Sequence, residues 1–332
     1  MTTTLKALLA SGLLLASSVA TAETIERDIC VFDIAGKVGP TMAAMQDWRT
    51  EAMNWGLDAN LKVYTNESVV AEDLKAGVCD AALMTGIRAR QFNKYAGTLD
   101  SIGAIPSMEH MKIALQVLAH PNSADKLTAN SYEVMGIAPI GAAYIFVNDR
   151  RVNTLAKAAG KKVAVLDYDP TQAKLVAAAG ATPVPSDITN FAGKFNNGVV
   201  DVIAAPLVAY NVLELYKGLE PDGGIIDYPL VQLSIQLIAK ADRFPDEMAQ
   251  TSREYFYNSL DQVLEQVERE ASAVDEKWWV DIPAKDKQEY EVMMQDARDQ
   301  MRNEGHYDPD MLDLLRKVRC KLNSSRAECT GA

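Results

Sequence analysis

The strongest fold signal lies in residues 160–206, which read GKKVAVLDYDPTQAKLVAAAGATPVPSDITNFAGKFNNGVVDVIAAP. The apolar run Val163 to Leu166 predicts a strand, and Asp169-Pro170 supplies a helix N-cap followed by a first-turn proline. A glycine then ends this helix, and a second strand, a second helix and the strand Val202 to Ala205 follow. Strands that alternate with helices in this way predict a parallel sheet with helices on its faces.

Strands and helices alternate in the same order nearer the N-terminus, where five elements are expected at 29–32, 41–55, 61–64, 66–76 and 81–84. The motif Gly77-Val78-Cys79-Asp80 has a counterpart in Gly198-Val199-Val200-Asp201. Asp80 follows Val63 at the same distance as Asp201 follows Val184. Equal spacing of strand, helix, motif and strand indicates two similar lobes.

We therefore expect an α/β protein of two lobes, each built on a doubly wound sheet. One lobe is expected to comprise residues 23–145 together with 230–332, whose long helices brace the molecule. The other lobe is expected to comprise residues 149–227. The chain would then cross between the lobes twice, near Val147 and near Leu230.

The composition limits the possible functions. The 332 residues carry 33 basic and 45 acidic side chains, a formal net charge of −12. This charge predicts no nucleic-acid partner, because such partners require a basic surface. The chain has three histidines, His110, His120 and His306, and none of the common nucleotide-binding, hydrolase or metalloprotease motifs. We expect no metal, no cofactor and no enzymatic activity.

Residues 1–22 read MTTTLKALLASGLLLASSVATA and contain the three parts of a secretory signal. Lys6 provides the basic start, the stretch from Ala7 to Ala20 is apolar, and Ala20-Thr21-Ala22 is a typical cleavage site. A membrane anchor or a buried helix is the alternative, but the apolar stretch is shorter than the ~20 residues that span a bilayer. We expect a cleaved signal peptide and a periplasmic protein.

The four cysteines fit an exported protein, in which an even number indicates disulfides, although four buried thiols are the alternative. Cys30 begins the first expected strand and Cys79 precedes the third, and these strands are neighbours in a doubly wound sheet of order 2-1-3. Cys320 and Cys329 would close a short loop at the C-terminus. Of the three possible pairings we predict Cys30–Cys79 and Cys320–Cys329.

Candidate ligand-binding residues are found at the carboxyl ends of the expected strands, where open α/β sheets bind ligands. Arg88 and Arg90 follow one such strand, and a guanidinium group suits a carboxylate or another anion. Two solvated surface arginines are the alternative. The expected site residues are Thr85, Arg88 and Arg90 in the first lobe, Asp167, Tyr168, Pro206 and Tyr210 in the second, and Tyr144 between them.

The stretch from Asn153 to Pro206 resembles the periplasmic solute-binding proteins of TRAP transporters, the DctP-like group. The resemblance lies in Gly160-Lys161-Lys162-Val163, in Gly180-Ala181-Thr182-Pro183-Val184-Pro185 and in Gly198-Val199-Val200-Asp201. It implies a two-lobed periplasmic-binding-protein fold with the ligand between the lobes. In that family an arginine that clamps the ligand carboxylate closes the first of these strands. Ala164 takes this position here, so the usual organic-acid clamp is not expected.

The pattern and the resemblance together predict an exported solute-binding protein. It would capture a small molecule between its lobes by hinge closure and deliver it, as a monomer, to separate integral-membrane permease subunits. One alternative is an envelope interaction or efflux-accessory protein on the same fold without a transported ligand, and another is an enzyme on the same scaffold. Three possibilities are open for the ligand: an acid held by Arg88 or Arg90, a neutral or cationic molecule, or none.

Overall fold

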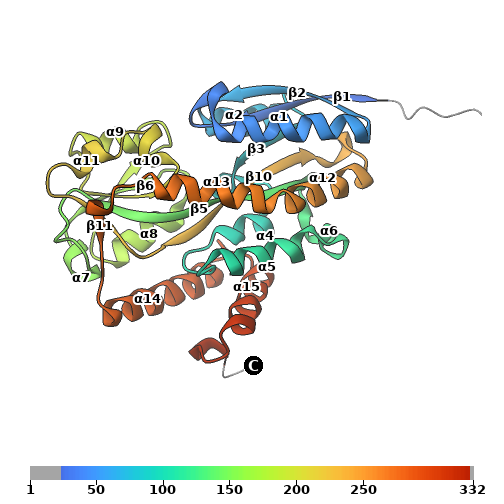
Figure 1. Ribbon diagram of the computed structural model, residues 1–332. Helices are drawn as coiled ribbons and strands as arrows, with labels where there is room; N and C mark the ends of the chain where they lie inside the picture. The colour runs from blue at the N-terminus through green and yellow to red at the C-terminus, as the bar shows by residue number, and fades with distance from the viewer. Residues whose placement is uncertain (1–23, 330–332) are drawn as a thin grey trace, which may run out of the picture.

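The computed structural model describes residues 24–329, so the expected signal peptide at 1–22 lies outside the described residues. The main strands form one continuous sheet in the order β2-β1-β3-β10-β5-β8-β6-β7 (Figure 1). Their bounds are β1 Ile25–Phe32, β2 Leu57–Tyr64, β3 Ala81–Thr85, β5 Tyr132–Val147, β6 Lys162–Leu166, β7 Thr182–Ser186, β8 Val202–Pro206 and β10 Val231–Lys240. Short strands lie off this path, namely β4 Thr128–Ala129, β9 Gly224–Ile226 and β11 Trp279–Val280.

Each end of the sheet carries the same unit of parallel strands. β1 pairs with β2 and β3 at one end, and β6 pairs with β7 and β8 at the other. The connecting helices are α1 (Pro40–Ala52) and α2 (Glu67–Ala76) in the first unit, and α8 (Pro170–Ala178) and α9 (Phe191–Asn196) in the second. The strand order of a doubly wound sheet is therefore confirmed for both halves.

The repeated Gly-Val-x-Asp motif has the same structural role in both units. Its glycine adopts a positive φ (79° and 68°), a left-handed conformation that favours glycine. The Asp80 carboxylate then accepts a hydrogen bond of 2.9 Å from the Asp28 amide, and the Asp201 carboxylate accepts one of 2.8 Å from the Lys162 amide. Each aspartate thus connects the residues just before the third strand of its unit with the first strand.

β5 and β10 pair with each other at the centre and join the two units into one sheet. Pro139 and the neighbouring glycines are typical strand breakers, so the sequence predicts a strand only from Ala142 onward. In the structure, β5 begins ten residues earlier, at Tyr132. The sheet accommodates these residues by a register shift opposite Pro139 and by a φ of +90° at Gly141. The chain crosses between the two halves along these two strands.

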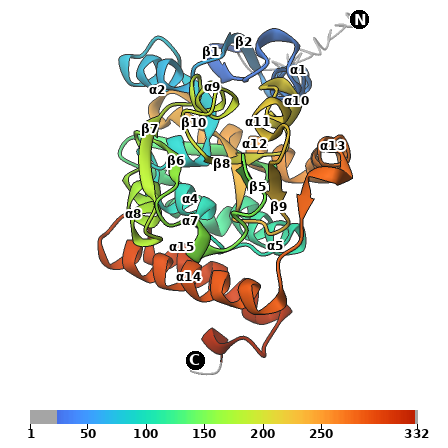
Figure 2. The same cartoon turned by 90° about the vertical axis from the view of Figure 1, so that its left-hand side faces the viewer.

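The helices after β10 are α12 (Asp246–Asn258), α13 (Leu260–Ser272), α14 (Ala284–Asn303) and α15 (Pro309–Leu322). The sequence predicts one helix over 246–274, but the structure divides it at Ser259 into α12 and α13. α12 packs Phe256 closely against Gly136 of β5. Figure 2 shows α14 lying along the outside of the molecule, and its Tyr290 and Met294 belong to an apolar cluster with residues from both halves.

Shorter helices complete the connections: α3 Gly86–Ala89, α4 Lys94–Gly97, α5 Met108–Ala119, α6 Ala124–Leu127, α7 Leu155–Ala158, α10 Ala209–Val212 and α11 Tyr216–Leu219. None of the helices within residues 24–329 is long and apolar enough to cross a membrane.

Both predicted disulfides are confirmed. Cys30 and Cys79 are bonded with their Cα atoms 5.8 Å apart, and Cys320 and Cys329 with their Cα atoms 5.6 Å apart. The first bond is buried in the apolar core beside Leu74 of α2. The second bond fastens the chain that follows α15 back onto this helix.

Candidate ligand-binding site

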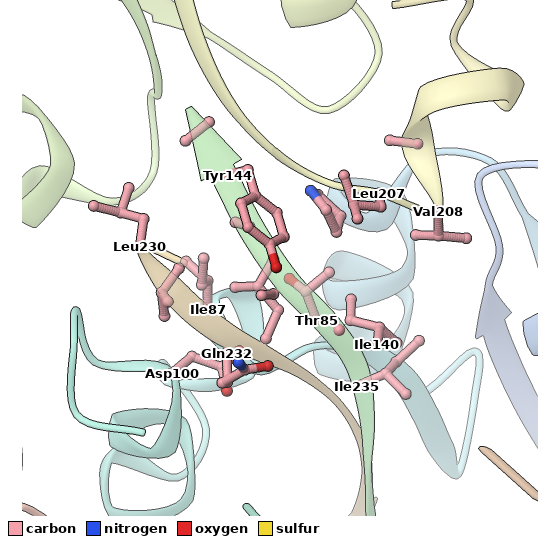
Figure 3. Close-up of a pocket in the computed structure, with 18 of the residues that line it drawn as sticks. Thr85, Ile87, Asp100, Ile140, Tyr144, Leu207, Val208, Leu230, Gln232 and Ile235 are labelled. Carbon is pink, nitrogen blue, oxygen red and sulfur yellow. The ribbon is translucent and has the colours of Figure 1, made fainter. Parts of the chain in front are cut away.

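A cavity of about 690 Å³ lies between the two parallel-strand units. The end of β3 and the segment after it supply Thr85 and Asp100 to one side of it, and the second unit supplies Tyr168 and Pro206 to the other. β5 and β10 cross between them, and Figure 3 shows Tyr144 of β5 pointing its hydroxyl group into the central space. Small-molecule sites typically have volumes of about 300–1,000 Å³, so the cavity has the size of a ligand site.

Most of the cavity wall is apolar. Aliphatic side chains from both units and from the crossover strands line it, among them Ile87, Ile140, Leu207, Val208, Leu230 and Ile235 (Figure 3). Removing apolar surface from water is favourable by roughly 25 cal/mol per Å². A ligand that fills this space therefore gains most of its binding free energy from an apolar body.

Asp100 is a deeply buried carboxyl group at the cavity. Its side chain is only 4% exposed, and its carboxylate accepts hydrogen bonds from the Ser234 amide (3.0 Å) and the Ser234 hydroxyl (2.6 Å). Burial raises the pKa of Asp100 to about 7, although the Ser234 donors and the field of Arg90 act in the opposite direction. The carboxylate thus lies at an apolar wall without an ion-pair partner.

Gln232 of β10 also lines the cavity, next to Asp100 (Figure 3), and is only 5% exposed. Its Oε1 atom is buried and has no hydrogen-bond partner within the described part of the chain. A buried polar atom without a partner costs free energy, so this amide oxygen is an acceptor that a donor could satisfy.

Two other buried carboxylates at the cavity are occupied by the backbone. Asp33 accepts from the amides of Ala35 and Met42, each at 2.8 Å, and so shapes the loop after β1. Asp169 caps α8 by accepting from the Thr171 amide (3.1 Å) and the Thr171 hydroxyl (2.5 Å). Among residues 24–329, no group of three or more His, Cys, Asp and Glu side chains is placed to hold a metal ion.

Glu67, Thr85, Arg88 and Tyr168 form a polar contact between the two halves, which we call the Glu67 cluster. Glu67 is fully buried at the start of α2 and accepts hydrogen bonds from the Thr85 hydroxyl (2.8 Å) and from the Tyr168 hydroxyl. The Arg88 Nε lies 3.6 Å from Glu67, and its guanidinium carbon lies 3.3 Å from the centre of the Tyr168 ring. Burial and the neighbouring Glu67 raise the pKa of Tyr168 well above its usual value.

Arg90 makes a second contact between the halves. Its Nε donates to the Gly97 carbonyl (3.1 Å), and its Nη1 lies 3.5 Å from an Asp169 carboxylate oxygen. The guanidinium also lies over the Tyr307 ring, with its carbon 4.9 Å from the ring centre. Neither Arg90 nor Arg88 is among the residues that line the cavity.

The structure brings four of the eight expected site residues together at the cavity: Thr85, Tyr144, Tyr168 and Pro206. The other four do not line it. Arg88 and Arg90 hold the two halves together, Asp167 is exposed, and Tyr210 is buried in the second unit edge-to-face with Tyr216. The position of Ala164, where the resemblance implies an arginine, lies on the cavity wall.

Sequence reasoning missed Asp100 and Gln232, which provide the polar centre of the cavity. A signal for them exists in β10, which reads Val-Gln-Leu-Ser-Ile-Gln-Leu over 231–237. Its polar residues alternate with apolar ones, which places them on one face of the strand. On that face the Ser234 hydroxyl donates to the Asp100 carboxylate, and the Gln236 amide donates to the Ala96 carbonyl (3.0 Å).

Two lobes that share crossover strands and enclose a cavity between them define the class of two-lobed solute-binding proteins. The chain belongs to the family described as Solute-binding protein AdeT 1/2, which matches residues 32–332.

Curated relatives support this assignment. Probable solute-binding protein AdeT1 of Acinetobacter baumannii is 45% identical over 299 residues, which cover 90% of this chain and 98% of that protein. Probable solute-binding protein AdeT2 of the same organism is 28% identical over 233 residues, which cover 70% of this chain and 98% of that protein.

Solved structures of TRAP periplasmic solute-binding proteins share the fold. The protein from Desulfovibrio salexigens with bound orotic acid has a TM-score of 0.74 at 14% identity, covering 90% of this chain and 99% of that one. The protein from Ralstonia eutropha H16 with bound (S)-2-acetolactate has a TM-score of 0.72 at 12% identity, covering 89% and 99%. At such identities the likeness concerns the fold alone. The relatives and these neighbours are solute-binding proteins and not enzymes.

Proposed function

We propose that the chain captures a small molecule between two lobes, residues 23–145 with 230–332 and residues 149–227, and closes over it by hinge motion. The observation that carries this proposal is the cavity of about 690 Å³ with walls from both units. A ligand that contacts both lobes binds the closed form more tightly and therefore shifts the population toward closure.

The crossover strands provide a place for the hinge. The β5–β10 pairing shifts register at Leu233 and Ser234, opposite Gly141 and Pro139, so the ladder is interrupted where the chain passes between the halves. The contacts of Tyr168 with Glu67 and Arg88, and the Arg90–Asp169 pair, form only when the halves meet. Closure would therefore make these contacts and opening would break them.

We further propose that the protein works in the periplasm after removal of residues 1–22, as a monomer, and delivers its ligand to integral-membrane permease subunits. The signal-like sequence of residues 1–22 supports export. The solved neighbours, which are described as TRAP periplasmic solute-binding proteins, support the same compartment.

Two measurements test ligand capture. Native mass spectrometry of the freshly purified mature protein should show one bound small molecule that is lost on unfolding. Small-angle scattering of the refolded, ligand-free protein should show a larger radius of gyration than the loaded protein, because the lobes separate. A chain without any bound molecule and with one unchanging scattering profile would contradict the proposal.

A further inference from the structure

The cavity is lined by acids far more than by bases. Within the described residues its lining includes five carboxylates, those of Asp33, Asp47, Asp100, Asp169 and Glu270, and one cationic group, that of Arg269. The Arg269 side chain is 62% exposed on α13 and donates to the Gln266 side chain (2.7 Å). An anionic ligand would therefore meet no buried cation in this cavity.

Arg88 and Arg90, the two arginines that follow β3 in the chain, already have partners within the protein. Arg88 stacks on the Tyr168 ring beside Glu67, and Arg90 bonds to the Gly97 carbonyl and faces Asp169. Turning either one toward a ligand would leave Glu67 or Asp169, which are buried, without a cation. Removing one partner of a buried ion pair is strongly destabilising, so the fold opposes such a rearrangement.

The buried polar atoms at the cavity are mainly hydrogen-bond acceptors with unused capacity. Asp100 Oδ1 and Oδ2 each accept one bond from Ser234, and an ionised carboxylate has about four acceptor positions. Gln232 Oε1 is buried and accepts no bond within the described chain. Both groups can accept a further donor, and a cationic donor would also neutralise the charge of ionised Asp100.

We propose, on the basis of the ligand capture proposed above, that the cavity binds an apolar amine, whose protonated nitrogen donates to Asp100 and Gln232 while its hydrocarbon body packs on the aliphatic walls. An ammonium ion can leave water only if a charged and hydrogen-bonding partner replaces its hydration. A carboxylate ligand would instead place a second acidic group against Asp100 and find no buried cation in the cavity lining. The organic acids in the neighbouring solved structures are the opposite class.

Matched probes of one shape test the ligand class. Calorimetric titration of the refolded, ligand-free mature protein would compare phenethylamine with phenethyl alcohol and phenylacetate, and tryptamine with indoleacetate. We expect each amine to bind at least tenfold more tightly than its matched acid, because only the ammonium group can donate a charge-assisted hydrogen bond to Asp100. An acid that binds as tightly as its amine overturns the proposal.

Two cavity variants and one surface variant test the residues. Asp100→Asn should weaken amine binding about tenfold or more and remove the preference over the alcohol. Gln232→Leu should weaken amine binding, because the protonated nitrogen loses one of its two acceptors. The control Asp125→Asn makes the same charge change on the exposed surface of α6 and should leave all affinities within about twofold. Unchanged amine binding in both cavity variants, each verified as folded by circular dichroism, overturns the assignment.

The native mass spectrum separates this proposal from ligand capture itself. A co-purified acid or sugar, with the amines inactive, leaves the proposed function standing and refutes the amine. If neither a co-purified molecule nor any probe is bound, ligand capture fails and the amine proposal fails with it. A co-purified molecule that contains a basic nitrogen, displaced by tryptamine, supports both.

Discussion

At the residue scale, Asp100 links the cavity to the stability of the fold. Burial raises its pKa to about 7, so its carboxyl group binds a proton more tightly in the folded than in the unfolded chain. Its contribution to stability is fully present below pH 4, where both states are protonated, and is lost as the pH rises through about 7. Arg90 and the Ser234 donors reduce this loss but do not abolish it.

Asp100→Asn should therefore change how stability depends on pH. Relative to the wild type, the free energy of unfolding of the variant should rise by roughly 2–3 kcal/mol between pH 5 and pH 8, since one pKa unit corresponds to about 1.4 kcal/mol. Urea denaturation of the ligand-free proteins at both pH values measures the difference. Parallel curves for the two proteins would show that Asp100 does not titrate in this range.

Individual residues also show where the prediction of site residues from sequence fails. Thr85, Tyr168 and Pro206 were predicted because they follow strands at the carboxyl edge of the sheet, and they line the cavity. Arg88 follows the same strand as Thr85, but its side chain lies against Glu67, which is distant in sequence, and does not line the cavity. A position after a strand predicts nearness to the site, whereas the direction of a long side chain depends on partners that only the fold brings together.

At the scale of elements, the contact between β5 and α12 depends on the absence of one methyl group. A Cβ at Gly136 would lie 2.3 Å from the Phe256 ring, which is rigid and only 9% exposed. Gly136→Ala should lower the free energy of unfolding by about 1–3 kcal/mol through overpacking. Gly193→Ala in α9 is the control, because a Cβ at this position has no neighbouring atom within 4 Å. This substitution should stabilise the helix by up to about 1 kcal/mol. Thermal denaturation of both variants gives the comparison.

The two disulfides should differ in their effect. Cys30–Cys79 joins residues 49 apart in the sequence, and Cys320–Cys329 joins residues 9 apart. The loss of loop-closure entropy predicts costs of about 4 and about 2.7 kcal/mol when each pair is replaced by alanines. The buried first pair also leaves a cavity in the core, so its removal should be clearly the more destabilising in urea denaturation. Equal midpoints for the two double variants would contradict this expectation.

The elements themselves could be predicted where local chemistry determines them. Asn66, the first residue of the element predicted at 66–76, accepts a hydrogen bond from the Ser68 amide as the N-cap of α2, and Gly77 ends this helix in a left-handed conformation. The full length of β5 could not be predicted, because Pro139 is tolerated only by a bulge that depends on pairing with β10. The break at Ser259 likewise has no local breaker residue in the sequence.

At the scale of the whole molecule, the Glu67 cluster would couple ligand binding to the proposed closure. Glu67 and Thr85 belong to one half, and Tyr168 comes from the other, so the Tyr168 hydroxyl can reach Glu67 only when the halves are together. In an opened molecule water would replace this donor at Glu67. Under the proposed closure, this hydrogen bond would therefore contribute to the free-energy difference between the open and closed forms rather than to the stability of either half.

Tyr168→Phe removes this hydroxyl and keeps the ring on which Arg88 stacks. The closed form then contains a buried carboxylate with one donor fewer, a cost of about 1–3 kcal/mol. Small-angle scattering should show a larger radius of gyration at subsaturating ligand, and ligand affinity should fall about tenfold, with a thermal midpoint of the ligand-free protein close to that of the wild type. The control is Tyr216→Phe, which removes a hydroxyl that bonds to Glu214 within the second half and should change neither quantity. Equal affinities of Tyr168→Phe and the wild type would mean that the cluster does not bear on closure.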